Sequence, residues 1–319
     1  MLLARKMAEN GGGFNCVKQG ARGMAADVRQ LLAKAAGRPI LIAGPTASGK
    51  SALALALAEA DGRPVVNADA LQVWSCWRLL SARPDAAEEA RAPHFLFGHR
   101  APGEDYSVGH WLREVDAVLA AHPAPILVGG TGLYLTALTE GLTDIPPIPP
   151  ATRAKGDTLR PTPEGVARMI AALDPETRSR IDLKNPMRVQ RAWEVAEATG
   201  RGLADWQAAT GPARLAGDAA LKLRIEADRD WLAERIDRRF DAMIAHGALD
   251  EVAAVRPYWD AQAPWARAIG AAELMAHLEG SLPLAEAITR AQALSRQYAK
   301  RQRTWLRARM AGWQPVARP

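Results

Sequence analysis

Eight consecutive residues have the glycine spacing and the lysine–serine ending of a phosphate-binding loop. They are Gly44, Pro45, Thr46, Ala47, Ser48, Gly49, Lys50 and Ser51. The glycines let backbone N–H groups approach phosphate oxygens, Lys50 adds positive charge, and the Ser51 hydroxyl is a candidate Mg²⁺ ligand. A buried strand is predicted at 39–43 and an Ala/Leu-rich helix at 52–60, which is the setting that this motif needs. We therefore predict a diphosphate site at this loop.

The acid that nucleotide hydrolysis would need is missing from the predicted strands. The loop of an ATPase or GTPase works with an Asp at the end of a later strand, which holds Mg²⁺. The candidate strands at 94–97 and 125–128 are followed by glycine instead. Asp69, just after a short apolar segment, is the acid best placed beside the loop. It is compatible with a metal ligand, with a base acting on the group that attacks the diphosphate, or with a cap of the next turn.

A second glycine-rich turn, Gly129-Gly130-Thr131-Gly132, follows the strand predicted at 125–128. In a parallel sheet this turn and the phosphate-binding loop lie at the same edge, where ligands bind such folds. Thr131 is therefore a candidate for a hydroxyl directed into the site. An ordinary tight turn capped by Thr131 would have the same sequence.

The alternation of short apolar segments with helical patterns indicates an α/β fold, a P-loop NTPase-like parallel sheet flanked by helices. Ser107 and Asn185 are candidate helix N-caps, and Gly200 has the position of a helix stop. Helices are predicted from after a strand at 221–227 to about residue 311. We predict three parts, a loosely ordered N-terminal extension at 1–36 with one short helix near 25–36, a catalytic core of 37–142 plus 221–319, and a helical insertion at 143–220.

Composition narrows the class of protein. The net charge is +6, which favours a polyanionic partner such as nucleic acid, although one net charge says little by itself. The two cysteines, Cys16 and Cys76, and the six histidines show no metal-ligand spacing. No run of roughly 18 apolar residues occurs, so no membrane span is predicted. We expect a cytoplasmic protein and, by default, a monomer.

In order along the chain, these motifs resemble the tRNA dimethylallyltransferase family. The resemblance extends from about residue 38 to 305 and rests on the phosphate-binding loop and on a set of further segments. These are NADALQVW at 67–74, YSVGHW at 106–111, PILVGGTGLYLTALTEGL at 125–142, NPMRVQRAWEV at 185–195, RIDRRF at 235–240 and KRQRTWLR at 300–307. The loop alone is shared by many families, but the ordered set is specific.

The resemblance implies a reaction and roles for individual residues. The loop would hold the diphosphate of dimethylallyl diphosphate, with Mg²⁺ as cofactor and Arg239 as a further diphosphate ligand beside Lys50. Asp69 would take a proton from N6 of the adenosine just 3′ of the anticodon, and Thr131 would touch the reacting region. A tRNA surface would include Asp69, Ala70, Leu71, Gln72, Thr131, Arg153, Met187, Arg188, Val189, Gln190 and Arg191.

The C-terminal helical region has its own nucleic-acid signal. From 287 to 319 there is no acid, and Arg296, Lys300, Arg303 and Arg307 recur at helical spacing. Such a basic stripe suits a phosphate backbone, although solvated surface charges would have the same pattern. Tyr298 and Trp305 lie on another face of the same helix, where we expect core positions.

Two segments depart from the family's usual sequence. Residues 80–84 read LSARP where GTAKP is usual, and residues 270–272 read GAA where an aromatic residue and a cation follow the glycine. We expect these changes to alter tRNA contacts more than the chemistry. Two other functions share parts of the pattern, a P-loop kinase of nucleotides or small molecules and a non-catalytic RNA-binding P-loop protein.

Overall fold

The computed structural model describes residues 27–318. Most of the predicted N-terminal extension therefore lies outside the described residues. Its last part, residues 27–35, is a helix whose side chains Val28, Leu31 and Ala35 are buried against the core. The short helix predicted near 25–36 is thus confirmed, and its apolar face packs into the core of the sheet domain.

The chain divides into two compact units. The first comprises Met1–Thr136 and Gly217–Pro319, and the second comprises Ala137–Ala216. The second unit therefore begins six residues before the predicted insertion at 143–220 and ends four residues before the insertion does. The helix that follows the second glycine-rich turn spans the boundary between Thr136 and Ala137, so the proline-rich residues 143–150 lie within the second unit.

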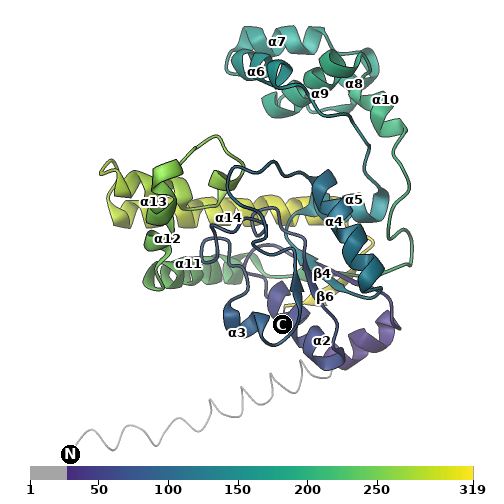
Figure 1. The fold of residues 1–319 in the computed structure, drawn as a ribbon, viewed down its shortest axis with the longest axis vertical. Helices are drawn as coiled ribbons and strands as arrows, with labels where there is room; N and C mark the ends of the chain where they lie inside the picture. Colours follow the sequence, from purple (N-terminus) through teal and green to yellow (C-terminus); the bar gives the residue numbers. More distant parts are fainter. Residues whose placement is uncertain (1–26, 319) are drawn as a thin grey trace, which may run out of the picture. The chain divides into compact units, whose positions relative to one another are not determined.

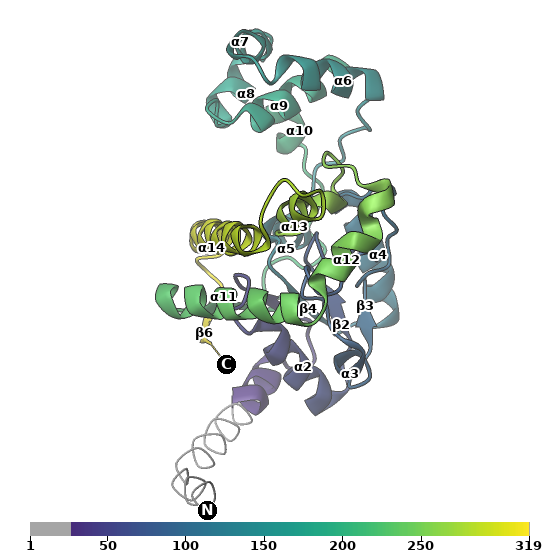
Figure 2. The ribbon, with the colours of Figure 1, turned by 90° about the vertical axis from the view of Figure 1, so that its left-hand side faces the viewer.

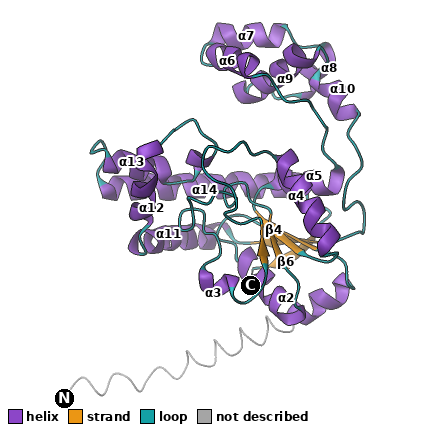
Figure 3. Ribbon diagram, viewed as in Figure 1, coloured by secondary structure: helices purple, strands orange, loops and turns teal. Residues whose placement is uncertain are grey.

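The first unit is built on one parallel six-stranded sheet, drawn in orange in Figure 3, with the order β3-β2-β4-β1-β5-β6. Its strands are β1 (Ile40–Ala43), β2 (Val65–Asn67), β3 (His94–Phe95), β4 (Ile126–Gly129), β5 (Leu221–Glu226) and β6 (Gln314–Ala317). The α/β class is confirmed. Strand β6 was not predicted, because its short sequence of mixed polarity becomes a strand only by pairing with β5.

The strand register brings three loops to one edge of the sheet. Ala43 at the end of β1 pairs with Gly129 at the end of β4, and Asn67 at the end of β2 pairs with Val128. The strands run parallel, so the segments that follow β1, β2 and β4 all leave from the same edge. The phosphate-binding loop, the Asp69 segment and the second glycine-rich turn are therefore neighbours.

The sheet of the first unit is accompanied by helices (Figure 1). They are α2 (Lys50–Asp61), α3 (Ala86–Glu89), α4 (Val108–Ala121), α5 (Gly132–Glu140), α11 (Arg229–Ala245), α12 (Ala248–Val255), α13 (Ala271–Leu278) and α14 (Leu284–Arg309), with 3-10 turns at Arg256–Tyr258 and Trp265–Arg267. The prediction for Ser107 is confirmed, since its hydroxyl caps α4 by accepting from the backbone N–H of His110. Helices α11 and α14 pack side by side, as Figure 2 also shows.

The second unit is entirely helical. It contains α6 (Pro150–Leu159), α7 (Pro163–Ala171), α8 (Pro175–Arg180), α9 (Pro186–Thr199) and α10 (Leu203–Ala208). The predicted limits of α9 are confirmed. Asn185 caps its first turn, and Gly200, with a positive φ of 66°, ends it. A small core that includes Met169, Val189 and Trp193 holds these helices together.

No helix among residues 27–318 is long and apolar enough to cross a membrane.

Candidate active site

The phosphate-binding loop wraps tightly between β1 and α2. Ala47 and Gly49 take left-handed conformations, with φ of 61° and 91°. A side chain at Gly44 would lie 2.7 Å from Ser48 Oγ, so this position requires glycine. The Ser48 side chain is fully buried, and its Oγ has no hydrogen-bond partner among residues 27–318. A buried hydroxyl without a partner is costly, which fits a loop shaped to receive an oxygen-rich group.

Two desolvated cations meet at this loop. Burial lowers the pKa of Lys50 to about 8, with Asp69 opposing the shift and Arg239 adding to it. Burial also lowers the pKa of Arg239 to about 10, with Arg235 adding to the effect. Arg239 comes from α11 and donates a hydrogen bond to Thr46 Oγ1, so it lies at the loop as predicted. Clustered cations taken out of water favour an anionic ligand between them.

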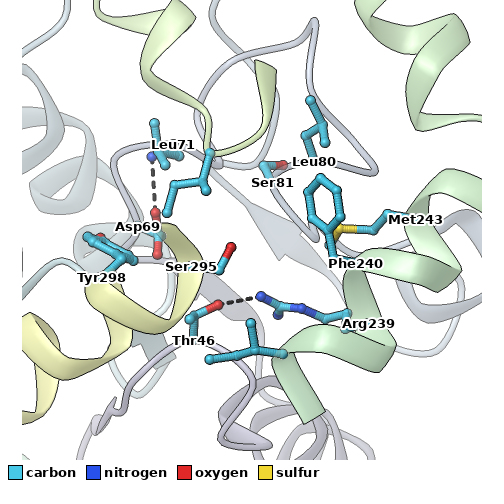
Figure 4. Close-up of a pocket in the computed structure, with 12 residues that line it drawn as sticks. Thr46, Asp69, Leu71, Leu80, Ser81, Arg239, Phe240, Met243, Ser295 and Tyr298 are labelled. Carbon is cyan, nitrogen blue, oxygen red and sulfur yellow. Dashed lines mark hydrogen bonds between the residues drawn. The ribbon is translucent and has the colours of Figure 1, made fainter. Parts of the chain in front are cut away.

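Asp69 is held rigidly just beyond β2. The side chain of Asn67, which is fully buried, accepts from the Asp69 N–H at 2.8 Å and donates to the Asp69 carbonyl at 3.0 Å. Asp69 Oδ1 accepts from the Leu71 N–H at 3.0 Å, as the dashed line in Figure 4 shows. Asp69 therefore does cap the next turn, one of the three possibilities, while its carboxylate also lines a cavity. Both roles are compatible because one oxygen makes the cap.

The second glycine-rich turn is tied to the Asp69 segment. Thr131 Oγ1 accepts from the Ala70 N–H at 2.9 Å, and the Thr131 N–H donates to the Ala68 carbonyl at 3.3 Å. A side chain at Gly129 would lie 1.9 Å from the Ala68 carbonyl oxygen, so only glycine allows this approach. Thr131 thus lies beside the predicted site, where its hydroxyl fixes the backbone that carries Asp69.

Helix α14 contributes two side chains that the sequence did not reveal as site residues. Gln302 is buried, and its Oε1 accepts from the Thr46 N–H at 2.8 Å while its Nε2 donates to the Gly130 carbonyl at 3.0 Å. Tyr298, one turn earlier, lines the cavity rather than the core, and its hydroxyl interacts with Thr131 and Gln302. The spacing of four residues between Tyr298 and Gln302 indicates that both lie on one face of the helix. It does not indicate that Gln302 links the phosphate-binding loop to the second glycine-rich turn.

The core position predicted for Trp305 is only partly borne out. Its ring is half-buried and covers Gly132, where a side chain would lie 2.0 Å from Trp305 Cζ3.

The cavity has a polar part and an apolar part, both visible in Figure 4. Its polar lining comes from Thr46, Asp69, Ser81, Arg239, Ser295 and Tyr298. Its apolar lining comes from Leu71, Leu80, Ile236, Phe240, Met243 and Ile269. A pocket with this division can hold a ligand that has an anionic head and a small hydrocarbon tail, next to a carboxylate able to accept a proton.

One of the four basic side chains of the stripe on α14 is already paired within the protein. Lys300 and Arg307 are exposed and Arg303 is half-buried, and all three line a groove between α11 and α14. Arg296 is instead paired with Asp237 on α11. The helical spacing placed Arg296 on the stripe correctly, but its charge is neutralised by an ion pair between helices.

Four of the residues predicted to contact tRNA in the second unit are exposed: Arg153, Met187, Arg188 and Arg191. Val189 is fully buried in the core of this unit, and buried Gln190 donates to Asp157 and Glu194. Helix α9 turns these two side chains inward, so any contact of theirs with tRNA would be made through the backbone, and the predicted contact stays a prediction.

Gln72, in the first unit, has a similar structural role. Its buried amide donates to the carbonyls of Ser81 and Ala82, at 2.9 Å each. The amide nitrogen of this side chain is therefore used within the protein, and the predicted tRNA contact stays a prediction.

The donor set around Ser51 suits a magnesium ion shared with phosphate. Ser51 is exposed in the first turn of α2. No cluster of three or more His, Cys, Asp or Glu side chains able to hold a metal occurs among the described residues. Mg²⁺ is commonly bound by few protein oxygens together with phosphate oxygens and water, so Ser51 fits such an ion but would not hold it alone.

Comparison with known proteins decides the family. Residues 72–309 match the family described as IPP transferase, and residues 38–93 match the one described as isopentenyl transferase. The chain belongs to the IPP transferase family. A Cereibacter sphaeroides protein named tRNA dimethylallyltransferase is 63% identical over 282 residues, covering 88% of this chain and 90% of the relative. Its counterpart from Paracoccus denitrificans is 61% identical, covering 86% and 93%.

Solved structures agree with this family in fold. The tRNA isopentenylpyrophosphate transferase of Bacillus halodurans has a TM-score of 0.63 and 29% identity, covering 88% of this chain and 89% of that one. A eukaryotic dimethylallyltransferase acting on tRNA has a TM-score of 0.71 and 25% identity, covering 88% and 73%.

The two departures from the usual IPP transferase sequence lie in different surroundings. We expected the first departure to alter tRNA contacts more than the chemistry. Leu80 and Ser81 instead line the cavity itself. At the second, Ala271 is fully buried in the first turn of α13, and Ala272 is exposed. Gly270 before them has a positive φ of 94° and no room for a side chain, because the Phe240 ring lies against it.

Proposed function

We propose that this protein transfers the dimethylallyl group of dimethylallyl diphosphate to N6 of the adenosine 3′ to the anticodon of tRNA, releasing diphosphate. The observation that carries the proposal is the cavity in which a phosphate-binding loop, Arg239 and Asp69 surround a small apolar space. Relatives at about 60% identity are named tRNA dimethylallyltransferase, which supports it.

The leaving group is stabilised by the loop and its cations. As the C1–O bond of the donor breaks, negative charge grows on the departing diphosphate. Lys50, Arg239 and the N–H groups of the loop are fixed around this anion before reaction begins, so little reorganisation accompanies the charge. The Gln302 bridge from α14 holds Thr46 at one side of this arrangement.

Asp69 completes the reaction as the base. The adenine N6 lone pair forms the bond to C1, and one N6 proton then passes to the Asp69 carboxylate. Asn67 and the Leu71 N–H keep the carboxylate in place, and Thr131 fixes the adjoining backbone. The adenosine has to leave its stack to reach this carboxylate, as in other enzymes that modify bases.

Mg²⁺ is proposed as a cofactor shared with the donor. Ser51 would hold it through the hydroxyl oxygen, together with oxygens of the diphosphate. When bound, the ion would offset negative charge on the diphosphate, in addition to the charge of Lys50 and Arg239.

The tRNA is proposed to contact basic side chains in each unit. In the first unit these are Lys300, Arg303 and Arg307, and in the second they are Arg153, Arg188 and Arg191. Arginine and lysine contacts to phosphates would give affinity that falls steeply with salt. The monomeric state and the cytoplasmic location stay predictions.

A direct transfer assay tests the proposal. Purified protein, Mg²⁺, labelled dimethylallyl diphosphate and unmodified tRNA with A at this position should yield labelled tRNA. No label, where a control enzyme gives label, would refute the function. A kinase would instead transfer phosphate from ATP. It is disfavoured because β3 and β4 end without an acid to hold Mg²⁺. A non-catalytic RNA-binding protein would retain tRNA and leave the donor intact.

A further inference from the structure

A second cavity adjoins the phosphate-binding loop. Its volume is about 240 Å³, and it is formed by Pro45, by residues 224–227 at the end of β5 and by the last turns of α14. Among residues 27–318, none lines both this cavity and the one beside Asp69. Pro45 lines the second cavity, whereas the next residue, Thr46, lines the first. The two cavities are therefore separate spaces beside adjacent residues of one loop.

Three arginines line the second cavity. Arg224 comes from β5, and Arg303 and Arg307 come from α14, where a spacing of four residues places them on one face of the helix. In the sheet, Arg224 pairs with Ala43, the last residue of β1 before the loop begins. The strand register and the helix thus bring arginines from distant parts of the sequence to one space beside the loop.

Acids do not balance these three cations. Glu226 is the one acid in the described lining, and it pairs with Arg224 at 2.7 Å. Asp228 lies outside the lining and interacts electrostatically with Arg303, while its Oδ1 accepts two backbone N–H groups at the start of α11. Arg303 and Arg307 form no ion pair within residues 27–318. The cavity therefore keeps an excess of positive charge.

The guanidinium group of Arg224 has hydrogen-bond donors to spare. This side chain is 13% exposed. Its Nη2 donates to Glu226 Oε1 at 2.7 Å, and its buried Nε has no hydrogen-bond partner among the described residues. A guanidinium group carries five N–H donors in one plane, and a buried donor without a partner is costly. Arginine pairs well with phosphate because two of its N–H groups can meet two phosphate oxygens.

We propose that the second cavity is an anion site for a phosphate group, separate from the diphosphate site of the loop. Free diphosphate, which the proposed reaction releases, and a backbone phosphate of tRNA would present the same oxygens to the three arginines. The inference goes beyond the proposed function, since it assigns a ligand to Arg224 and to a cavity that takes no part in the transfer. Arg303 and Arg307 would then serve this cavity as well as the groove between α11 and α14.

Equilibrium dialysis with labelled inorganic diphosphate tests binding of the free anion. The background variant is Lys50→Met, in which the loop holds diphosphate less well. This protein should retain a diphosphate site, and adding Arg224→Gln should weaken that site about tenfold or more, since hydrogen bonds between charged groups are lost. Arg290→Gln is the matched control, because it removes the same charge from an exposed ion pair with Glu286 on α14, and it should leave binding unchanged.

Titration of tRNA at several salt concentrations tests the backbone phosphate. A cavity filled by the tRNA backbone predicts that Arg224→Gln reduces the slope of log affinity against log salt by about 1. Arg290→Gln should leave this slope at the wild-type value.

The two measurements together decide the source of the phosphate. Weaker diphosphate binding with an unchanged salt slope identifies the free anion, and a reduced slope identifies the tRNA backbone. Arg224→Gln that matches Arg290→Gln in both measurements would overturn the anion site. Absence of isoprenyl transfer would refute the proposed function and leave either binding result standing. Thermal unfolding shows whether Arg224→Gln is folded; if it is not, Arg307→Gln, at an exposed position of the same cavity, is judged by the same dialysis.

Discussion

The bridge made by Gln302 offers the sharpest test of how the site is assembled. Its amide joins the Thr46 N–H of the phosphate-binding loop to the Gly130 carbonyl of the second glycine-rich turn, at 2.8 and 3.0 Å. The side chain is 6% exposed, so water does not replace these bonds freely. Gln302→Ala removes both bonds and leaves a donor and an acceptor without partners.

The magnitude follows from these two groups. Each buried polar group left without a partner costs about 1–3 kcal/mol. Thr46 is half-buried and can recover part of its loss from water, so we expect a total of about 2–4 kcal/mol. For a domain of roughly this size, that lowers Tm by about 5–10 °C. If about 1.4 kcal/mol of it is lost from donor binding, the KM for dimethylallyl diphosphate rises about tenfold.

A charged substitution tests the same bridge. Gln302→Glu keeps an acceptor for the Thr46 N–H but has no proton to donate to the Gly130 carbonyl, and it adds negative charge beside the bound diphosphate. Donor KM should therefore rise at least as far in Gln302→Glu as in Gln302→Ala, and kcat should fall because the turn that carries Thr131 is released. Steady-state kinetics with donor varied at saturating tRNA measures both parameters.

A control on the same helix distinguishes this role from general stability. Gln292 donates to the carbonyl of Asp237 and to Asp241 Oδ1, linking α14 to α11 away from the cavity. Gln292→Ala should lower Tm without raising donor KM. A Gln302→Ala protein with donor KM within twofold of wild type would refute the reasoning, because the loop would then hold its shape without the bridge.

Three further outcomes are expected. Asp69→Ala should lower kcat by about 100-fold or more with tRNA binding retained, and an equal loss of tRNA binding would contradict its role as base. Donor affinity should decrease as pH rises through about 8, because the folded protein lowers the pKa of Lys50 to about that value and the neutral amine holds diphosphate less well; Lys50→Met should abolish this dependence in a binding titration. Arg303→Ala should weaken tRNA binding and reduce the slope of log affinity against log salt by about 1, and an unchanged slope would exclude it from the interface.

Local sequence patterns determined the elements and part of the site. The loop from Gly44 to Ser51 is recognisable because its chemistry depends on backbone freedom and charge at fixed spacing. The caps at Ser107, Asn185 and Gly200 were predicted for the same reason, since each acts on neighbouring residues. Arg239 was predicted only through the family resemblance, and the structure places it at Thr46.

Contacts between distant segments were decided only by the tertiary structure. Gln302 meets Thr46 and Gly130 across 256 and 172 positions of sequence, so no local pattern could show its two bonds. Val189 and Gln190 lie beside exposed Arg188 and Arg191, and only the packing of α9 decides which of these faces inward. Leu80 became a cavity wall because α11 places Phe240 and Met243 beside it. Spacing along the chain therefore determined which chemical groups are present, and packing determined which of them meet, because the energy of burial depends on neighbours that the local sequence does not contain.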